Sequence, residues 1–386
     1  MTCAIAGKVN LAFADGVLSG GDVMHRWLFV VLGIALVNVA VPSSTVFAQN
    51  VKPPTARQFV VSNGDGTCQV GGKFVPCDAQ FSVDHAGQKL LKELDNLDSV
   101  DITQKTAAIE EQFSDLCRSN RQLIDGRWTS QVFSIKVGHS FAVWKNWDSY
   151  FRFVREWRKL APQSEALAVV ESMLWRAFAW DARGTGFANT VSDSNWRLFR
   201  ERTQRALDSL QKFGGNRSSC DLWYAEKLNA FRGMGESLAD IRAVFVEGIG
   251  RYPKSLAIYG AMGLAVSPKW QGSLELFDEF ARQAAKRSAD FEGAGMYARL
   301  YWTIDDESLK LENSSYPDWS LLRRGFEDLL KRYPDSWWNA NKFASFACRA
   351  RDKDAYLLAM EKVGMALNYA AWTASRPEFC DLRMLK

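Results

Sequence analysis

The feature that most constrains the fold is an internal repeat. Residues 245–255 (FVEGIGRYPKS) align without a gap with residues 326–336 (FEDLLKRYPDS), at an offset of 81 residues, and a weaker copy surrounds Pro162. Pro cannot continue the preceding helix, and the Ser two positions later can cap the next one. The offset equals two units of about 40 residues, which falls in the range of helical repeat arrays. The repeat therefore predicts helical hairpins.

Apolar residues at helical spacing continue from residue 144 almost to the end of the chain. Trp147 and Phe151 mark one stripe, and Phe153 and Trp157 mark the adjoining one, which gives a broad face for burial. About 240 residues of this pattern exceed a four-helix bundle and favour stacked hairpins. The expected fold class is mainly α, with residues 144–386 as a helical-repeat domain.

The hairpins resemble degenerate tetratricopeptide-like repeats. That family places an aromatic residue before the helix-ending Pro and a small residue three positions after the aromatic one, as Phe245 and Gly248 stand before Pro253. In the second copy, Phe326 keeps the aromatic position but Leu329 replaces the small residue. The family's regular period of about 34 residues is missing. The resemblance implies an α-solenoid scaffold that binds protein segments on a concave surface.

The chain is also similar to an uncharacterised family of exported bacterial proteins with tryptophan-rich helical bodies. This similarity implies neither an activity nor functional residues. The export of that family agrees with the signal-peptide pattern of residues 24–48, described next.

Residues 24–48 have the order of a secretory signal peptide. The basic residue Arg26 precedes an apolar run over residues 27–41, and small residues end at Ala48. The run is shorter than the ~20 apolar residues that cross a bilayer. We therefore expect a periplasmic or secreted protein with no stable membrane span after processing. An uncleaved amino-terminal anchor is the alternative.

Met24 is the expected start of translation. Residues 1–23 carry Asp15 and Asp22 where an export signal tolerates little acid. They are expected to be a non-native extension upstream of the true start, with Met1 as the alternative start. The mature chain is expected to begin at Gln49.

Residues 49–143 are expected to hold a small β meander and helices. Over residues 58–83, short runs prone to form strands lie between Asn-Gly, Asp-Gly and Gly-Gly turn signals, which predicts an antiparallel meander. Residues 86–120 carry apolar side chains at helical spacing and predict helices. Residues 122–143 predict a short strand pair, because β-branched and aromatic residues stand there between glycines.

Cysteine usage agrees with export. Six cysteines, an even number, remain in the mature chain, in a compartment where disulfides persist: Cys68, Cys77, Cys117, Cys220, Cys348 and Cys380. Six cysteines allow 15 pairings, so the connectivity stays open. Metal binding by these cysteines is less favoured than disulfide formation, since no CxxC pair exists and only His85 and His139 remain in the mature chain.

Two disulfides are named as candidates. Cys68 and Cys77 are the closest pair, and a two-residue turn at the glycines between them places Cys68 opposite Val75 and diagonal to Cys77. A diagonal separation of about 7–8 Å is long for a bridge, so that pair requires a bulge or a wider loop. Cys348 and Cys380 are the second candidate, as a clip on the carboxy-terminal helices.

The charge of the chain excludes some partners. The formal net charge is only +4 over 92 acidic and basic residues, and acids are interleaved with bases along most of the chain. So small an excess argues against nucleic acid and against an anionic membrane surface. No motif for a cofactor is found either.

The fifteen tryptophans allow two interpretations. Aromatic platforms bind sugars and peptides, whereas core tryptophans fill gaps between helices. Core packing is favoured for most of them. Trp337 and Trp338 are the exception, because neighbours on a helix point ~100° apart and cannot both face one core. One of this pair is therefore a candidate exposed binding residue.

The loop Arg183-Gly184-Thr185-Gly186 is the most motif-like segment. Its backbone N–H groups and Arg183 can hold a carboxylate or phosphate. The loop lacks the lysine of a P-loop and the third glycine of a dinucleotide site. A glycine that ends a helix, with Arg183 on the last turn, explains the same residues and is favoured.

Catalytic motifs are nearly absent. His139 and Ser140 are adjacent but lack the closing glycine of a nucleophile elbow, and no HExxH is present. The acidic run from Asp305 to Glu307 can hold a cation or begin a helix. Carboxylate pairs of glycosidases meet in space and leave no trace in sequence.

Two classes of function remain open. The favoured one is a non-enzymatic exported interaction scaffold, whose partner is another envelope or secreted protein or peptide. The alternative is an exported hydrolase or glycan-acting protein with a tryptophan-lined cleft. Carboxylates and exposed rings in one deep pocket favour the enzyme, whereas dispersal of these residues favours the scaffold.

Overall fold

The computed structural model describes most of the chain from residue 102 onward, together with four short strands. The described residues are 58–59, 61–62, 67–70, 73–76 and 102–384, apart from 120, 185, 216–217, 306–314 and 365. The predicted signal peptide and the mature start at Gln49 lie outside them. Contacts group Pro54–Lys386 as one compact unit.

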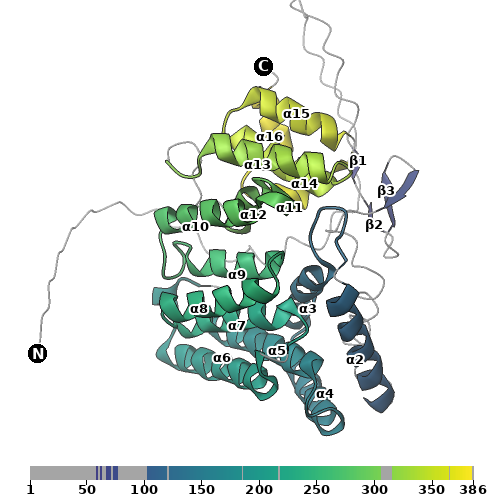
Figure 1. Cartoon of the computed structure of the whole chain (residues 1–386), viewed down its shortest axis with the longest axis vertical. Coiled ribbons are helices and arrows are strands. Elements are labelled where there is room, and N and C mark those ends of the chain that lie inside the picture. Colours follow the sequence, from purple (N-terminus) through teal and green to yellow (C-terminus); the bar gives the residue numbers. More distant parts are fainter. Residues whose placement is uncertain are drawn as a thin grey trace, which may run out of the picture. The chain divides into compact units, whose positions relative to one another are not determined.

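The described chain is mainly helical, as predicted (Figure 1). The helices are α2 Ile102–Ser119, α3 Thr129–Trp144, α4 Trp147–Leu160, α5 Glu165–Arg183, α6 Asp193–Phe213, α7 Asp221–Met234, α8 Leu238–Arg251, α9 Leu256–Ala265, α10 Leu274–Arg287, α11 Ala289–Glu292, α12 Gly295–Thr303, α13 Trp319–Arg332, α14 Trp337–Arg349, α15 Lys353–Val363 and α16 Pro377–Met384, with 3-10 turns η1 Ala188–Thr190 and η3 Tyr369–Ala371. None of these described helices is both long and apolar enough to span a membrane.

Short strands occur where the sequence predicts a meander. These are β1 Gln58–Phe59, β2 Val61–Ser62, β3 Thr67–Val70 and β4 Lys73–Pro76. A further strand, β5 Ala366–Leu367, lies near the other end of the chain. β2, β3 and β4 pair antiparallel, while β1 pairs in parallel with β5. Cys68 lies opposite Val75, the register that a two-residue turn predicts. Because Cys77 and the linking residues lie outside the described ones, the compact meander and the Cys68–Cys77 bridge stay predictions.

The predicted strand pair over residues 122–143 is wrong. Only an isolated bridge joins Gln122 to Trp128, and α3 follows directly. Phe133, Val137 and Phe141 are buried, and their spacing of four residues places them on one face of a helix. This periodicity outweighs the β propensity of the individual residues.

The three helix-ending turns that the repeat predicts share one backbone geometry. The residue after α4, α8 and α13 has φ between −137° and −126° and ψ between 65° and 67°. The serine three positions later accepts a hydrogen bond from the backbone N–H of the next helix, at 2.9, 3.3 and 3.1 Å for Ser164, Ser255 and Ser336. The predicted caps at Ser255 and Ser336 are confirmed.

The predicted burial of the repeated phenylalanines is confirmed as well. Phe245 and Phe326 are both buried. Phe326 stacks on Phe343 of α14, with ring centroids 5.3 Å apart and planes inclined by 12°. Phe245 meets Tyr259 of α9 edge to face at 5.6 Å. Each ring therefore packs against the helix that follows its turn.

The two copies differ in which helix supplies the small residue. A Cβ added to Gly248 of α8 would lie 3.1 Å from the Cβ of Tyr224 on α7. In the second copy Leu329 of α13 is large, and a Cβ added to Gly295 of α12 would lie 2.6 Å from Leu329 Cδ2. The small residue has moved to the preceding helix, so close packing is kept although the motif is broken.

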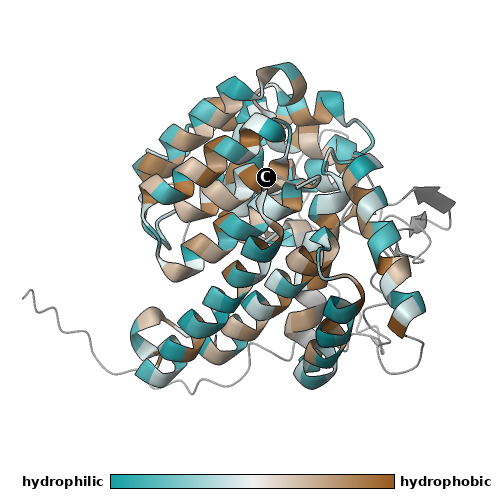
Figure 2. Cartoon of the chain, turned by 60° about the horizontal axis from the view of Figure 1, so that its bottom comes forward, coloured by the Kyte–Doolittle hydropathy of each residue, from teal (hydrophilic) through white to brown (hydrophobic). Residues whose placement is uncertain are grey.

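Helices that are neighbours in the chain pack on one another. α8 contacts α9, α10 contacts α12, α13 contacts α14, and α12 contacts both α9 and α13. Hydrophobic and hydrophilic residues mix along each helix, as amphipathic helices require (Figure 2). α2 and α3 also pack on α4, α5 and α7, so contacts cross the predicted boundary between residues 143 and 144. The division into domains there stays a prediction.

Aspartates at two helix starts tie three of these helices together. Asp318, the cap of α13, accepts from Arg282 of α10 at 3.2 Å, and Asp352, the cap of α15, accepts from Arg323 of α13 at 3.0 Å. Burial alone would raise the pKa of each aspartate, but hydrogen bonds from the helix backbone and the charge of the arginines hold it below its ordinary value. The same interaction, an arginine that donates to a helix-capping aspartate, joins α10 to α13 and α13 to α15.

Candidate functional site

The best candidate for a binding site is an apolar groove across α8, α9 and α10, called here the α8–α10 groove. Its volume is about 180 Å³. The groove is lined by Arg242, Phe245, Val246, Tyr259, Met262, Val266, Leu276, Glu279, Phe280, Gln283, Ala284 and Arg287.

The floor of the groove is apolar and partly aromatic. Tyr259 and Met262 of α9 and Val266 directly after it are buried there. Phe245 of α8 and the half-buried Phe280 of α10 meet edge to face, with centroids 5.4 Å apart. Aromatic pairs of this kind hold a fixed geometry, so the floor is preformed.

Val246 marks the open side of the groove. Its side chain is 54% exposed, although Phe245 beside it is buried. Consecutive residues on a helix point ~100° apart; the buried face of α8 includes Val244 and Phe245, and Val246 lies beyond its edge. Val246 is thus an exposed apolar side chain at the edge of the α8–α10 groove, accessible to a bound partner.

The rim of the groove is charged. Arg242, Glu279 and Arg287 are exposed, which gives two cations and one carboxylate. Burial raises the pKa of the Tyr259 hydroxyl, and the charge of Arg287 opposes that shift. A single carboxylate among the lining residues is one short of the pair that a glycosidase needs. The lining suits an apolar side chain flanked by acidic groups.

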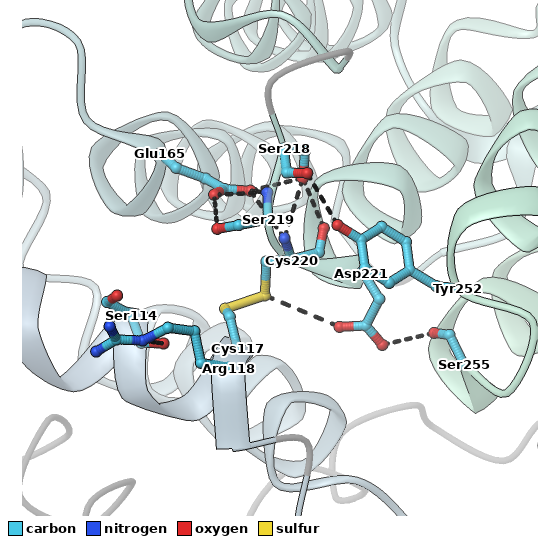
Figure 3. The surroundings of a disulfide bond; sticks show 10 residues. All are labelled: Ser114, Cys117, Arg118, Glu165, Ser218, Ser219, Cys220, Asp221, Tyr252 and Ser255. Carbon is cyan, nitrogen blue, oxygen red and sulfur yellow. Dashed lines mark hydrogen bonds between the residues drawn. A yellow bond between two sulfur atoms is a disulfide. The ribbon is translucent and has the colours of Figure 1, made fainter.

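A second cavity, of about 400 Å³, is lined in part by Cys117 of α2. Figure 3 shows the disulfide that joins Cys117 to Cys220 before α7. The two Cα atoms are 5.0 Å apart. Glu165 accepts from the backbone N–H of Cys220 at 3.2 Å and from the backbone N–H and Oγ of Ser219 at 3.0 and 2.6 Å. These hydrogen bonds fix the start of α7.

Asp221 and Arg251 of this second cavity are held by hydrogen bonds. Asp221 is buried and accepts from Ser255 Oγ at 2.6 Å. Burial raises the pKa of the Asp221 carboxyl, against hydrogen bonds from Ser255 and Ser130. Arg251 donates to the carbonyl of Ser218 at 3.2 Å. The cavity is therefore interpreted as a structural junction that joins α2 to the turns before α7 and α9.

Arg183 is engaged by its own loop. Its guanidinium lies 5.2 Å from the ring centres of both Trp180 and Trp196, and it donates to the carbonyls of Gly184 and Gly186 at 3.1 and 3.0 Å. α5 ends at Arg183, and Gly184 has a φ of 73°, a conformation that favours glycine. These contacts support the helix-stop interpretation of this loop.

Neither Trp337 nor Trp338 is exposed. Trp338 is buried between Arg127 and Lys342, whose charged groups lie 5.4 and 5.5 Å from its ring centre, and Trp337 is half-buried. The expectation of one exposed ring fails because α14 is covered by α13, α15, α16 and β5. A helix enclosed in this way has no free face.

The other tryptophans and the acidic run are also placed. Every tryptophan whose side chain is described is buried or half-buried. Asp305 is buried and paired with Arg349 and with Lys342, the latter at 3.3 Å; Asp306 and Glu307 lie outside the described residues. Within the part of the chain described, no three metal-ligating side chains come together.

The candidate residues named from the sequence do not converge. Arg183 contacts α5 and α6, whereas Trp338 contacts Arg127 and Lys342. Cys348 and Cys380, the candidate clip, form a disulfide with Cα atoms 5.7 Å apart.

The α8–α10 groove was not predicted from the sequence. Its one signal is the run of three adjacent apolar residues 244–246, which cannot all face one core; the structure buries Val244 and Phe245 and exposes Val246.

Comparisons with known proteins give no family for this chain. No protein-family model matches it, and no curated protein matches its sequence. The geometry of the chain itself therefore carries the functional argument.

Proposed function

We propose that this chain is an exported, non-enzymatic interaction protein. In this proposal a small β meander precedes a tetratricopeptide-like array of stacked helical hairpins, and the array binds a segment of another envelope or secreted protein. The α8–α10 groove is the proposed site. The observation that carries the proposal is a preformed apolar floor beside the exposed Val246.

Three repeated features support a hairpin array. The turns after α4, α8 and α13 share one geometry. Helices that follow one another pack together, and Asp318 and Asp352 tie α10, α13 and α15. Repeat arrays of this kind bind partners along extended surfaces.

The disulfides support an oxidising compartment. Cys117 pairs with Cys220, and Cys348 pairs with Cys380. Structural disulfides are rare where glutathione and thioredoxin keep thiols reduced. A periplasmic or secreted location is therefore proposed, which makes an envelope or secreted protein the expected class of partner.

The lining of the groove sets the chemistry of the segment. When an apolar side chain enters such a groove, each Å² of apolar surface that it removes from water favours binding by about 25 cal/mol. Arg242 and Arg287 on the rim favour acidic residues beside that anchor, because opposite charges steer association. We propose a segment with an apolar anchor and an acidic flank.

Val246→Glu tests this proposal. The variant is expected to lose at least tenfold in affinity for the native partner, because a carboxylate replaces an apolar contact. The free energy of unfolding should change by less than about 0.5 kcal/mol, since position 246 is exposed. Leu160→Glu is the matched control, at a residue of α4 that is 49% exposed and outside the groove. Quantitative retention of cell-envelope proteins on the three immobilised mature proteins is the measurement. Equal retention by Val246→Glu and the native chain would contradict the proposal.

A further inference from the structure

The two disulfides of the described chain differ in their exposure. Cys348 and Cys380 are both buried, at 1% and 0% exposed. In the other bridge Cys220 is 1% exposed, but Cys117 is half-buried and lines the cavity of about 400 Å³. A disulfide breaks when a thiolate attacks one of its sulfurs, and access to that sulfur governs the rate. The longer bridge is therefore open to attack through Cys117, whereas the shorter one is closed on both sides.

The cavity beside Cys117 suits a small anionic molecule. Its volume falls within the ~300–1,000 Å³ of small-molecule pockets. Trp128 and Tyr252 give its lining aromatic surface, and the exposed Arg118 and Lys254 give it cations. Cations in a concave surface attract anions and raise their local concentration. The lining therefore favours a molecule that carries a carboxylate.

The same cations favour thiol chemistry at Cys117. A thiol loses its proton more readily beside arginine or lysine, and the thiolate is the form that attacks. Arg118 follows Cys117 in α2, and both residues line the cavity. The Nε of Arg118 donates to the Ser114 carbonyl at 3.3 Å. Partly exposed cysteines in electropositive surroundings are typical of reactive sites, whereas fully buried ones are inert.

The buried sulfur of this bridge has an acid beside it. Asp221 Oδ1 lies 3.9 Å from Cys220 Sγ (Figure 3). A thiolate released at Cys220 would be buried, where an uncompensated charge is costly. Burial raises the pKa of the Asp221 carboxyl, and a protonated carboxyl can give its proton to that sulfur. The surroundings therefore favour attack at Cys117 and release of Cys220.

We propose that Cys117 is the site of a reversible modification by a small thiol that carries a carboxylate. The thiolate attacks Cys117 Sγ and forms a new S–S bond, while the bond between Cys117 and Cys220 breaks. The electron pair of the broken bond goes to Cys220 Sγ, which takes the proton of Asp221, and solvent restores that proton. The incoming thiol is oxidised to the mixed disulfide and Cys220 is reduced to a thiol, so no further oxidant is needed. Attack of Cys220 on the adduct restores the bridge.

Treatment of the folded mature chain with mercaptopropionate tests this site. Alkylation of the free thiols after an acid quench, and peptide mapping without reduction, identify the products. The adduct is expected on Cys117 and the alkyl group on Cys220, with the bridge of Cys348 and Cys380 intact. Reaction at Cys117 should be faster than at the buried bridge by about tenfold or more. An adduct on Cys220, equal reaction at both bridges, or no reaction while circular dichroism shows a folded chain would overturn the proposal.

Matched thiols and one charge reversal test the class of thiol. At equal thiolate concentration, the anionic mercaptopropionate should react at Cys117 faster than neutral mercaptoethanol, and the cationic cysteamine should react slowest. Lys254→Glu should slow mercaptopropionate by about threefold. Lys286→Glu, at an exposed residue of α10 outside the cavity, is the control and should leave the rates unchanged. Equal rates for the three thiols, or equal effects of the two charge reversals, would overturn the assignment of a thiol that carries a carboxylate.

Discussion

Replacing Cys117 and Cys220 together by serine is expected to lower the free energy of unfolding by about 2–5 kcal/mol. The bridge joins residues separated by 103 positions, so its loss frees a long loop in the unfolded chain. It also releases α2 from the start of α7, where Glu165 and Ser219 fix the backbone. Equilibrium denaturation of the mature protein in urea measures the change.

The second disulfide supplies the matched comparison. Cys348 and Cys380 are separated by 32 positions. Loop entropy alone makes the effect of losing this bridge about 1 kcal/mol smaller than that of losing the longer one. Should the double serine variant at Cys117 and Cys220 unfold like the native protein, the interpretation of that cavity as a structural junction would fail.

Phe326→Ala is expected to cost about 3–5 kcal/mol, the range for a buried aromatic truncation. Phe326 is fully buried, stacks on Phe343, and lies 5.2 Å from the Phe346 ring centre. Its removal leaves a cavity between α13 and α14 that the enclosed helices cannot easily fill. Thermal and urea unfolding of the variant measure the loss.

Ser336→Ala is the control for this variant. It removes one helix cap, the hydrogen bond accepted from Asn339 N at 3.1 Å, and should cost only about 1 kcal/mol. A silent Phe326→Ala would mean that the aligned phenylalanines are not the shared core of the hairpins. The sequence repeat would then not correspond to a structural repeat of hairpins.

Local chain chemistry made the helix ends predictable. A helix-ending Pro and a following Ser act within a few residues, so the turns at Pro253 and Pro334 and the caps at Ser255 and Ser336 could be predicted from the sequence and agree with the structure. The mainly helical fold class follows from the same periodicity. Strand propensity misled over residues 129–144, where burial at helical spacing decides the structure.

Features that depend on distant partners were not predictable. The α8–α10 groove needs the relative placement of the three helices α8, α9 and α10. The break in the motif at Leu329 has the same origin, because Gly295 on another helix compensates for it. The pairing of Cys117 with Cys220 joins residues 103 positions apart, which no local pattern in the sequence specifies.

Photo-cross-linking from the α8–α10 groove tests the central claim most directly. A photoreactive aromatic residue is placed at position 246 of the exported protein and, as the matched site, at position 160, both of which bear exposed apolar side chains. The proposed function predicts one dominant cross-linked envelope or secreted protein from position 246 that is absent from position 160. The same cross-links from both positions, or none from position 246, would contradict it.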